Sequence, residues 1–272
     1  MGYLTTVKKK VTVKTFVEMK RDGNKIAMLT AYDYTTARLI DEAGVDSILV
    51  GDSASNVMLG NDSTLPITLD EMIVYARGVA RGCQRALVVC DMPFGSYQVS
   101  PEEGVRNAVR LIRETGVDAV KLEGGEEVAP TIERIVNAGI PVVGHLGLTP
   151  QSIHKFGGYG VRARSEVEAT KLIADAQALE KAGCFAVVLE KIPASVAQQV
   201  TDLLSVPTIG IGAGSHCDGQ VLVYADAMGL TQGFDPKFLR EFAAMGEELR
   251  RGVRAYCEAV KGDEFPNESE SY

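Results

Sequence analysis

Short runs of apolar, β-branched residues alternate along the chain with longer stretches in which apolar residues recur every three or four positions. The first pattern is typical of strands buried in a parallel sheet, and the second is typical of amphipathic helices that cover such a sheet. The alternation therefore predicts repeated strand–helix units. We expect strands at residues 26–30, 47–50, 86–90, 119–122, 141–144, 186–189, 208–211 and 221–224.

Residues typical of helix ends support the same division. Ser100 suits the N-cap of a helix that ends near Thr115, Pro101 suits its first position, and Gly116 suits its stop. Short phrases that contain glycine also precede several of the predicted strands, and each supplies a helix stop followed by a tight turn. The chain is therefore built from a repeated half-unit.

Two architectures place helices outside a parallel sheet of this size, a (β/α)8 TIM barrel and a doubly wound open sheet. No linker rich in Pro or Ser divides the chain, so we predict a single α/β domain over residues 1–272, folded as a (β/α)8 barrel. An extra N-terminal helix at 13–21 is expected to close the bottom of the barrel. We also expect a long helix over 236–259 and an acidic, frayed tail at 263–272.

Composition narrows the classes of partner. The 36 acidic residues outnumber the 28 basic ones and give a formal charge of −8, which argues against nucleic acid or an anionic membrane as a partner. The 5 cysteines form no C-x-x-C pair, so neither a disulfide framework nor a structural zinc site is expected. No apolar run is long enough to span a bilayer, and together these features predict a cytoplasmic protein.

Polar residues gather at the carboxyl ends of five neighbouring predicted strands. The catalytic groups of barrel enzymes come from these ends, which meet at one rim. Each residue alone could equally be a helix cap or part of a loop ion pair, but their joint occurrence predicts an active site. The candidates are Asp52, Ser53, Asp91, Lys121, Glu123, His145 and Glu190.

Asp52 and Asp91 end adjacent strands, so their carboxylates can converge on a hard divalent cation, for which Mg²⁺ is the natural choice. The alternative is that each accepts backbone N–H bonds at a turn. Lys121 and Glu123 point to the same strand face because side chains alternate. They either neutralise each other, or Lys121 holds a substrate carboxylate while Glu123 contacts the metal through water.

Glu190 ends the sixth predicted strand, across the barrel from the second and third. There it faces the expected metal pair without binding the metal, which is where a general base is needed; an ion pair with Lys191 is the alternative. Flanking glycines leave the ring of His145 unshielded, although a structural role stays open. The loops at 53–68 and 148–164 are longer than ordinary strand–helix connections, so we expect them to bind ligand.

Several short motifs spread over nearly the whole chain are highly specific when taken together. They are Leu29-Thr30-Ala31-Tyr32-Asp33, Val50-Gly51-Asp52-Ser53, Asp91-Met92-Pro93-Phe94-Gly95, Val120-Lys121-Leu122-Glu123-Gly124, Gly144-His145-Leu146-Gly147-Leu148-Thr149-Pro150-Gln151, Lys155-Phe156-Gly157-Gly158 and Ile209-Gly210-Ile211-Gly212-Ala213-Gly214. With these motifs the chain resembles the ketopantoate hydroxymethyltransferase family. The resemblance implies a barrel that transfers a one-carbon unit from 5,10-methylenetetrahydrofolate to 3-methyl-2-oxobutanoate, giving 2-dehydropantoate for pantothenate synthesis.

The resemblance also implies roles for the residues at the rim and an assembly. A Mg²⁺-stabilised enolate of the 2-oxo acid would attack the methylene carbon of the folate. A homo-oligomer, specifically a homodecamer, is implied as well. By matching position, the metal residues are Asp52, Asp91 and Glu123, the substrate-binding residues are Ser53, Asp52, Asp91, Lys121 and His145, and the base is Glu190.

Two other functions stay open at this point. A Mg²⁺-dependent 2-oxo acid barrel of the phosphoenolpyruvate mutase and isocitrate lyase type also uses enolates, but it needs a cysteine- or phosphate-based site that this sequence does not show clearly. A catalytically idle barrel that serves in assembly is the second, because a fold alone does not prove activity. Joint thermal stabilisation by Mg²⁺ and 3-methyl-2-oxobutanoate would favour the family over the idle barrel.

Overall fold

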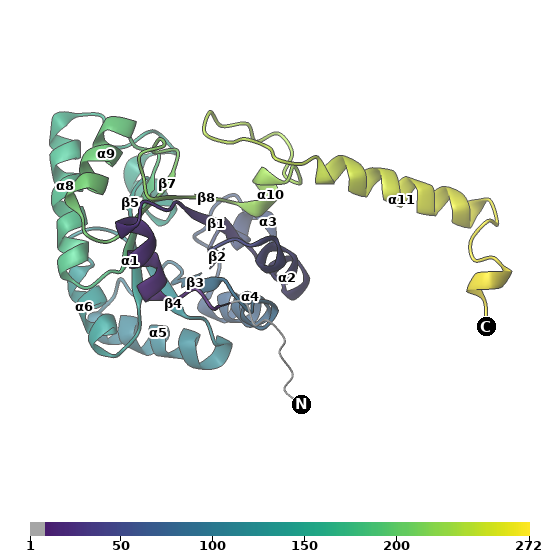
Figure 1. Cartoon of the computed structure of the whole chain (residues 1–272), viewed down its shortest axis with the longest axis horizontal. Helices are drawn as coiled ribbons and strands as arrows, with labels where there is room; N and C mark the ends of the chain where they lie inside the picture. Colours follow the sequence, from purple (N-terminus) through teal and green to yellow (C-terminus); the bar gives the residue numbers. More distant parts are fainter. Residues whose placement is uncertain (1–8) are drawn as a thin grey trace. The chain divides into compact units, whose positions relative to one another are not determined.

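The computed structural model describes residues 9–272 and contains a closed barrel of parallel strands that follow one another in sequence order (Figure 1). The predicted (β/α)8 barrel is therefore confirmed. The strands are β1 (Ile26–Thr30), β2 (Ser47–Val50), β3 (Leu87–Asp91), β4 (Ala119–Glu123), β5 (Val142–Gly147), β6 (Ala186–Glu190), β7 (Thr208–Ile211) and β8 (Gly219–Leu222).

Several strands extend further toward the rim than their apolar runs predict. β4 continues to Glu123, β5 to Gly147 and β6 to Glu190. Partners on the next strand explain this extension, because Glu123 lies in register with His145, and Gly147 with Glu190. Polar residues that a strand prediction leaves out thus become part of the barrel wall, where their positions are fixed by the sheet.

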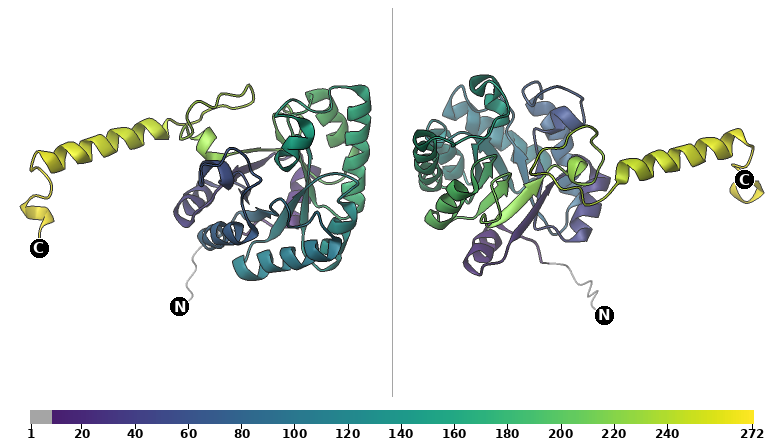
Figure 2. Two further views of the ribbon diagram at one scale, coloured as in Figure 1. Left: turned by 180° about the vertical axis from the view of Figure 1, so that it is seen from behind. Right: turned by 90° about the horizontal axis from the view of Figure 1, so that it is seen from above.

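Six helices that follow strands surround the barrel (Figure 2). They are α2 (Tyr34–Ala43), α4 (Leu69–Gly82), α5 (Pro101–Thr115), α6 (Ala129–Asn137), α8 (Glu166–Lys181) and α9 (Ala194–Leu203). Shorter helices lie in the loops after β2 and β5: α3 (Ala54–Val57), the 3-10 helix η1 (Pro150–Ser152) and α7 (Ile153–Phe156). Within residues 9–272, the loop 212–218 joins β7 to β8 without a helix.

The ends of α5 confirm the boundary residues expected from the sequence. The Ser100 side chain accepts a hydrogen bond from the backbone N–H of Glu103, and Pro101 occupies the first position, where no intrahelical N–H bond is lost. Gly116 ends the helix in the left-handed conformation, with φ of 81°, which glycine adopts without steric strain.

The helix α1 (Val13–Arg21) closes the bottom of the barrel, as predicted. Thr12 caps it, since its side chain accepts a hydrogen bond from the backbone N–H of Thr15. Phe16 is only 1% exposed and belongs to one buried cluster with Ile26 at the start of β1. Its ring meets that of Phe185 edge-on, with 5.8 Å between centroids, so apolar burial holds the helix against the amino ends of the strands.

The chain divides into two compact units, the second of which is Val223–Tyr272. This unit contains α10 (Tyr224–Ala227), α11 (Met245–Lys261) and the 3-10 helix η2 (Glu268–Glu270). The single domain over residues 1–272 and the fraying of residues 263–272 stay predictions. None of the helices in residues 9–272 is long and apolar enough to cross a membrane.

The helix predicted over 236–259 was wrong at its beginning. α11 begins at Met245, and residues 236–244 are not helical. The backbone N–H groups of Phe242, Met245 and Gly246 instead donate to the carbonyls of residues 227–229, just after α10. Hydrogen bonds between segments therefore replace those that a longer helix would make, and a local pattern of apolar residues does not reveal this.

Candidate active site

The candidate residues lie together at the carboxyl ends of β2 to β6. Asp91 and Glu190 are the last residues of β3 and β6, and Asp52 follows β2. The sheet therefore supplies the site from neighbouring strands, as a parallel barrel does. Buried within it are Asp52, Asp91, Lys121, Glu123 and His145.

Asp91 connects β2 to β4. Its Oδ2 accepts a hydrogen bond of 3.0 Å from the backbone N–H of Asp52, and its Oδ1 lies 2.9 Å from the Nζ of Lys121. The first contact agrees with the alternative in which an aspartate accepts backbone N–H bonds. Because only one oxygen is used in this way, the carboxylate keeps an oxygen that faces the charged centre of the site.

Lys121, Glu123 and His145 form the middle of the cluster. The Nζ of Lys121 lies 3.1 Å from the Nδ1 of His145, and Oε1 of Glu123 lies 3.3 Å from the same nitrogen. Lys121 and Glu123 share the inner face of β4, as strand alternation predicts. The Lys121 ammonium pairs with the Asp91 carboxylate, so Glu123 is not its only negatively charged neighbour.

Glu190 closes the cluster on the β6 side. Its Oε2 lies 3.4 Å from the Nε2 of His145, and its side chain is 16% exposed, more than the other acidic groups of the site. Lys191 does not pair with it in the described residues, because the Lys191 ammonium donates to the carbonyl of Tyr159. Glu190 is therefore a carboxylate at the border between the buried cluster and solvent.

Ser53 is placed differently from the other candidates. Its hydroxyl lies 2.7 Å from the hydroxyl of Tyr32, and it precedes the short helix α3. No hydrogen bond joins Ser53 to the acidic cluster within residues 9–272. The structure therefore brings Asp52, Asp91, Lys121, Glu123, His145 and Glu190 together and leaves Ser53 beside them.

Burial changes the ionisation of the acidic groups. Loss of water raises the pKa of Asp52 well above its usual range, and the nearby negative charges of Asp91 and Glu123 raise it further. Burial also raises the pKa of Glu123 to about 7, against the attraction of the Lys121 ammonium. For both carboxyl groups, the loss of water therefore outweighs the attraction of the nearby Lys121 ammonium.

The pKa values of the two basic groups, Lys121 and His145, shift in opposite directions. Burial works against the charge of Lys121, but the carboxylates of Asp91, Glu123 and Asp52 outweigh it and raise the pKa of the lysine above its ordinary value. Burial and the neighbouring Lys121 charge lower the pKa of His145, so its ring is neutral at pH 7. The site therefore holds one permanent cation among several acidic groups.

Gln151 is a central residue that the sequence did not single out for the site. Its Nε2 donates to Oδ2 of Asp52 at 2.9 Å and to the Met92 carbonyl at 3.0 Å. Its backbone N–H donates to Oε2 of Glu123 at 2.9 Å, and its Oε1 accepts a bond of 2.7 Å from the hydroxyl of Tyr97. Its position could have suggested a role, because Gln151 lies in the loop 148–164, which we predicted to bind ligand.

The donor set of the site fits a Mg²⁺ ion. In residues 9–272 no group of three or more His, Cys, Asp or Glu side chains is arranged as a complete ligand set. Mg²⁺ is commonly held by one or two carboxylates together with water and substrate, which Asp52 and Asp91 can provide. Oε1 of Glu123 is buried and has no hydrogen-bond partner. Because buried polar atoms are normally paired, this oxygen fits a site that is completed by a bound ion and its water.

Comparison with known proteins gives a consistent result over the full length. A family model described as ketopantoate hydroxymethyltransferase matches residues 10–268. The chain is 59% identical over 264 residues to the 3-methyl-2-oxobutanoate hydroxymethyltransferase of Flavobacterium johnsoniae, covering 97% of each chain. It is 60% identical to the protein of the same name from Parabacteroides distasonis, again over 264 residues and 97% of each chain.

Solved structures share the fold at much lower identity. A 2,3-dimethylmalate lyase, described as a member of the PEP mutase/isocitrate lyase superfamily, has a TM-score of 0.59 and 17% identity, covering 96% of this chain and 91% of that one. A phosphonopyruvate hydrolase solved with oxalate and Mg²⁺ has a TM-score of 0.61 and 11% identity, covering 95% and 92%. Likeness at such identity shows the barrel fold alone.

Proposed function

Because the chain belongs to the ketopantoate hydroxymethyltransferase family and is an enzyme of that family, we propose that it transfers a hydroxymethyl group from 5,10-methylenetetrahydrofolate to 3-methyl-2-oxobutanoate. The product is 2-dehydropantoate, an intermediate of pantothenate synthesis. One observation carries the proposal: an ammonium, several carboxyl groups and a neutral imidazole form one buried cluster at the rim of the barrel.

The residues of the cluster have separate tasks in this reaction. Asp52 and Asp91 would hold Mg²⁺, and Glu123 would lie near the ion without binding it directly. When bound, the ion supplies positive charge at the keto oxygen and so stabilises the enolate of the 2-oxo acid. Lys121 binds the carboxylate of 3-methyl-2-oxobutanoate, since its raised pKa keeps it charged.

Glu190 is the base that removes the C3 proton of the keto acid. It borders the cluster opposite the aspartates, and its contact with His145 orients the carboxylate toward the site. His145 and Ser53 contact the substrate beside it. The C3 electron pair then forms a bond to the methylene carbon while the bond of that carbon to N10 of the folate breaks. Water replaces N5 at the same carbon and becomes the new hydroxyl group. The proton removed from C3 and one proton of the water end on the two released nitrogens, so that tetrahydrofolate leaves.

We further propose a cytoplasmic homo-oligomer, specifically a homodecamer, that has no nucleic-acid or membrane partner. Five large apolar residues of α11 are 41–61% exposed, and their spacing of three or four positions places them on one helix face. Apolar faces of this extent are usually covered by another protein chain, and most soluble oligomers are built from copies of one chain. They are Met245, Leu249, Val253, Tyr256 and Val260.

Product formation tests the proposed reaction directly. Purified protein is incubated with 3-methyl-2-oxobutanoate, 5,10-methylenetetrahydrofolate and Mg²⁺, and 2-dehydropantoate is measured by mass spectrometry. We expect product with Mg²⁺, its loss with a chelator and its return when Mg²⁺ is added in excess. Equal rates with and without chelator would contradict the metal-dependent step, and the absence of product under all conditions would contradict the reaction itself.

A further inference from the structure

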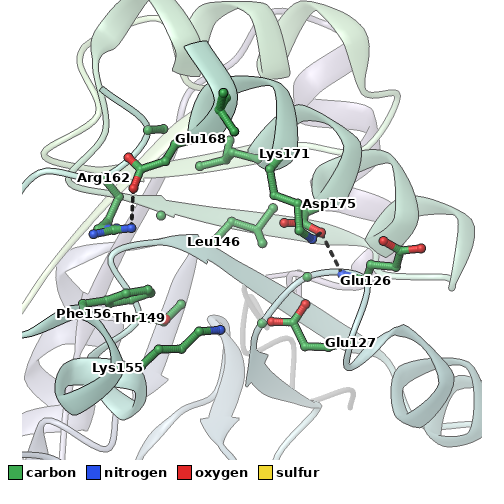
Figure 3. Close-up of a pocket in the computed structure, with 16 residues that line it drawn as sticks. Glu126, Glu127, Leu146, Thr149, Lys155, Phe156, Arg162, Glu168, Lys171 and Asp175 are labelled. Atoms are coloured by element: carbon green, nitrogen blue, oxygen red, sulfur yellow. Dashed lines mark hydrogen bonds and ion pairs between the residues drawn. The ribbon is translucent and has the colours of Figure 1, made fainter. Parts of the chain in front are cut away.

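A cavity of about 750 Å³ is bounded by the loops that follow β4 and β5 and by α8 (Figure 3). Its wall contains Gly124 and Leu146, the residues that directly follow Glu123 and His145. Gly147, also in the wall, packs so closely on β6 that an added Cβ would lie 2.2 Å from the carbonyl oxygen of Glu190. The cavity and the cluster therefore share parts of the same backbone.

Two charged side chains in the cavity are free to bind a ligand. Lys155 and Glu127 point into the cavity toward one another in Figure 3, and neither forms an ion pair among the residues that the structure describes. Of the other charged lining groups, Arg162 pairs with Glu168 at 2.5 Å and Lys171 pairs with Asp175 at 2.5 Å. The carboxylate of Glu126 points away from Lys155 and Glu127 in Figure 3. An unpaired carboxylate and an unpaired ammonium thus remain next to an apolar wall.

The apolar part of the cavity suits a flat ring. Phe156 lines it, and the guanidinium of Arg162 lies 4.2 Å from the centroid of that ring, which fixes the orientation of the aromatic plane. Leu146 and Leu172 are buried in the same wall. Gly125 packs directly against the Asp175 side chain. A Cβ at position 125 would lie 2.2 Å from the Asp175 carboxyl carbon, so only glycine fits there.

We propose that this cavity binds the pterin ring of the folate co-substrate, an inference that rests on the proposed function. The ring presents an amino group and a ring N–H side by side, followed by a carbonyl oxygen. The Glu127 carboxylate can accept from both donors, and the Lys155 ammonium can donate to the carbonyl oxygen. Gly147 of the cavity wall lies in register with Glu190, the proposed base, so the proposal places the one-carbon unit at the edge of the cavity nearest β6.

Calorimetry with tetrahydrofolate tests the assignment in the full-length protein. Glu127→Gln and Lys155→Met each remove a hydrogen bond to a charged group, so the Kd for tetrahydrofolate should rise by about 10- to 100-fold. The fragment 6-methyltetrahydropterin, which lacks the benzoyl-glutamate part, should lose affinity by the same factor. Lys181→Met is the matched control, because Lys181 ends α8 outside the cavity, and its Kd should equal that of the wild type.

The possible results separate the cavity from the reaction. Equal Kd values for wild type, Glu127→Gln and Lys155→Met would overturn the cavity assignment, provided that each variant still binds 3-methyl-2-oxobutanoate with Mg²⁺. A loss with tetrahydrofolate but not with the pterin fragment would overturn it too, because the pair would then bind the glutamate tail. Wild-type protein that binds tetrahydrofolate but forms no 2-dehydropantoate would instead overturn the proposed function alone.

Discussion

The side-chain amide of Gln151 donates a hydrogen bond of 2.9 Å to Oδ2 of Asp52, although the two residues are 99 positions apart in the chain. The same residue donates its backbone N–H to Glu123. One residue thus orients two carboxyl groups that we assign to the metal site, one through its side-chain amide and the other through its backbone N–H. Orientation by a neutral group matters here because an added charge would compete with the metal for these carboxylates.

Removing the Gln151 amide should weaken metal binding without removing a ligand. In Gln151→Met, Asp52 loses a donor while the volume of the side chain is nearly kept, and we expect Mg²⁺ affinity to fall by about 10- to 100-fold. Calorimetric titration with Mg²⁺ in the presence of 3-methyl-2-oxobutanoate measures it. Gln98→Met is the control, because the Gln98 side chain donates to Oε1 of Gln151 and accepts from the backbone N–H of Gly95 but contacts neither carboxyl group, so its loss should change affinity little.

Loss of either aspartate should have a larger effect. Asp52→Asn and Asp91→Asn keep the size of the side chain but remove the negative charge, so Mg²⁺-dependent binding of the keto acid should fall by more than about 100-fold. The barrel itself should stay folded, as circular dichroism would report. Unchanged affinity for metal and keto acid in both variants would remove these residues from the metal site.

Glu190 should control the exchange of one substrate hydrogen. Wild-type protein with Mg²⁺ and no folate should exchange the C3 hydrogen of 3-methyl-2-oxobutanoate for deuterium in D₂O. Glu190→Gln has the same shape but cannot accept the proton, so exchange followed by NMR should slow by about 10²- to 10⁴-fold while the keto acid still binds. Exchange at the wild-type rate in Glu190→Gln would show that another group is the base.

The bottom of the barrel offers a test of stability away from the site. Phe16→Ala should lower the free energy of unfolding by about 3–5 kcal/mol, because a large aromatic side chain leaves a cavity in the buried cluster. Val17→Ala on the same helix is the control, since Val17 is 42% exposed and should change stability by less than about 0.5 kcal/mol. Urea unfolding compares the two, and similar losses would show that α1 does not hold the barrel end.

The exposed face of α11 should be needed for assembly. Leu249→Glu and Tyr256→Glu place charge on that face, so sedimentation at micromolar protein should show smaller species than the wild type. Arg254→Gln, on the same helix but outside the apolar set, serves as the control and should sediment like the wild type. A wild-type protein that sediments only at 29.1 kDa would contradict the homo-oligomer.

The barrel and most of its rim follow from the sequence because both depend on short-range patterns. Strand periodicity places Lys121 and Glu123 on one face, and parallel strands bring their carboxyl ends to one rim. Gln151 and Tyr97 were missed because their contacts depend on how two loops fold over the rim, which no period encodes. The start of α11 was missed for the same reason, since its preceding backbone bonds to residues near α10.

The aromatic contact between Phe16 and Phe185 blocks the lower end of the barrel to ligands. Because these rings fill the lower end of the barrel, a keto acid bound at Lys121, as we propose, would have to arrive and depart through the upper opening. The cavity assigned to the pterin borders that same opening. Both substrates would therefore approach the protein from its upper end, where the carboxyl ends of the strands lie.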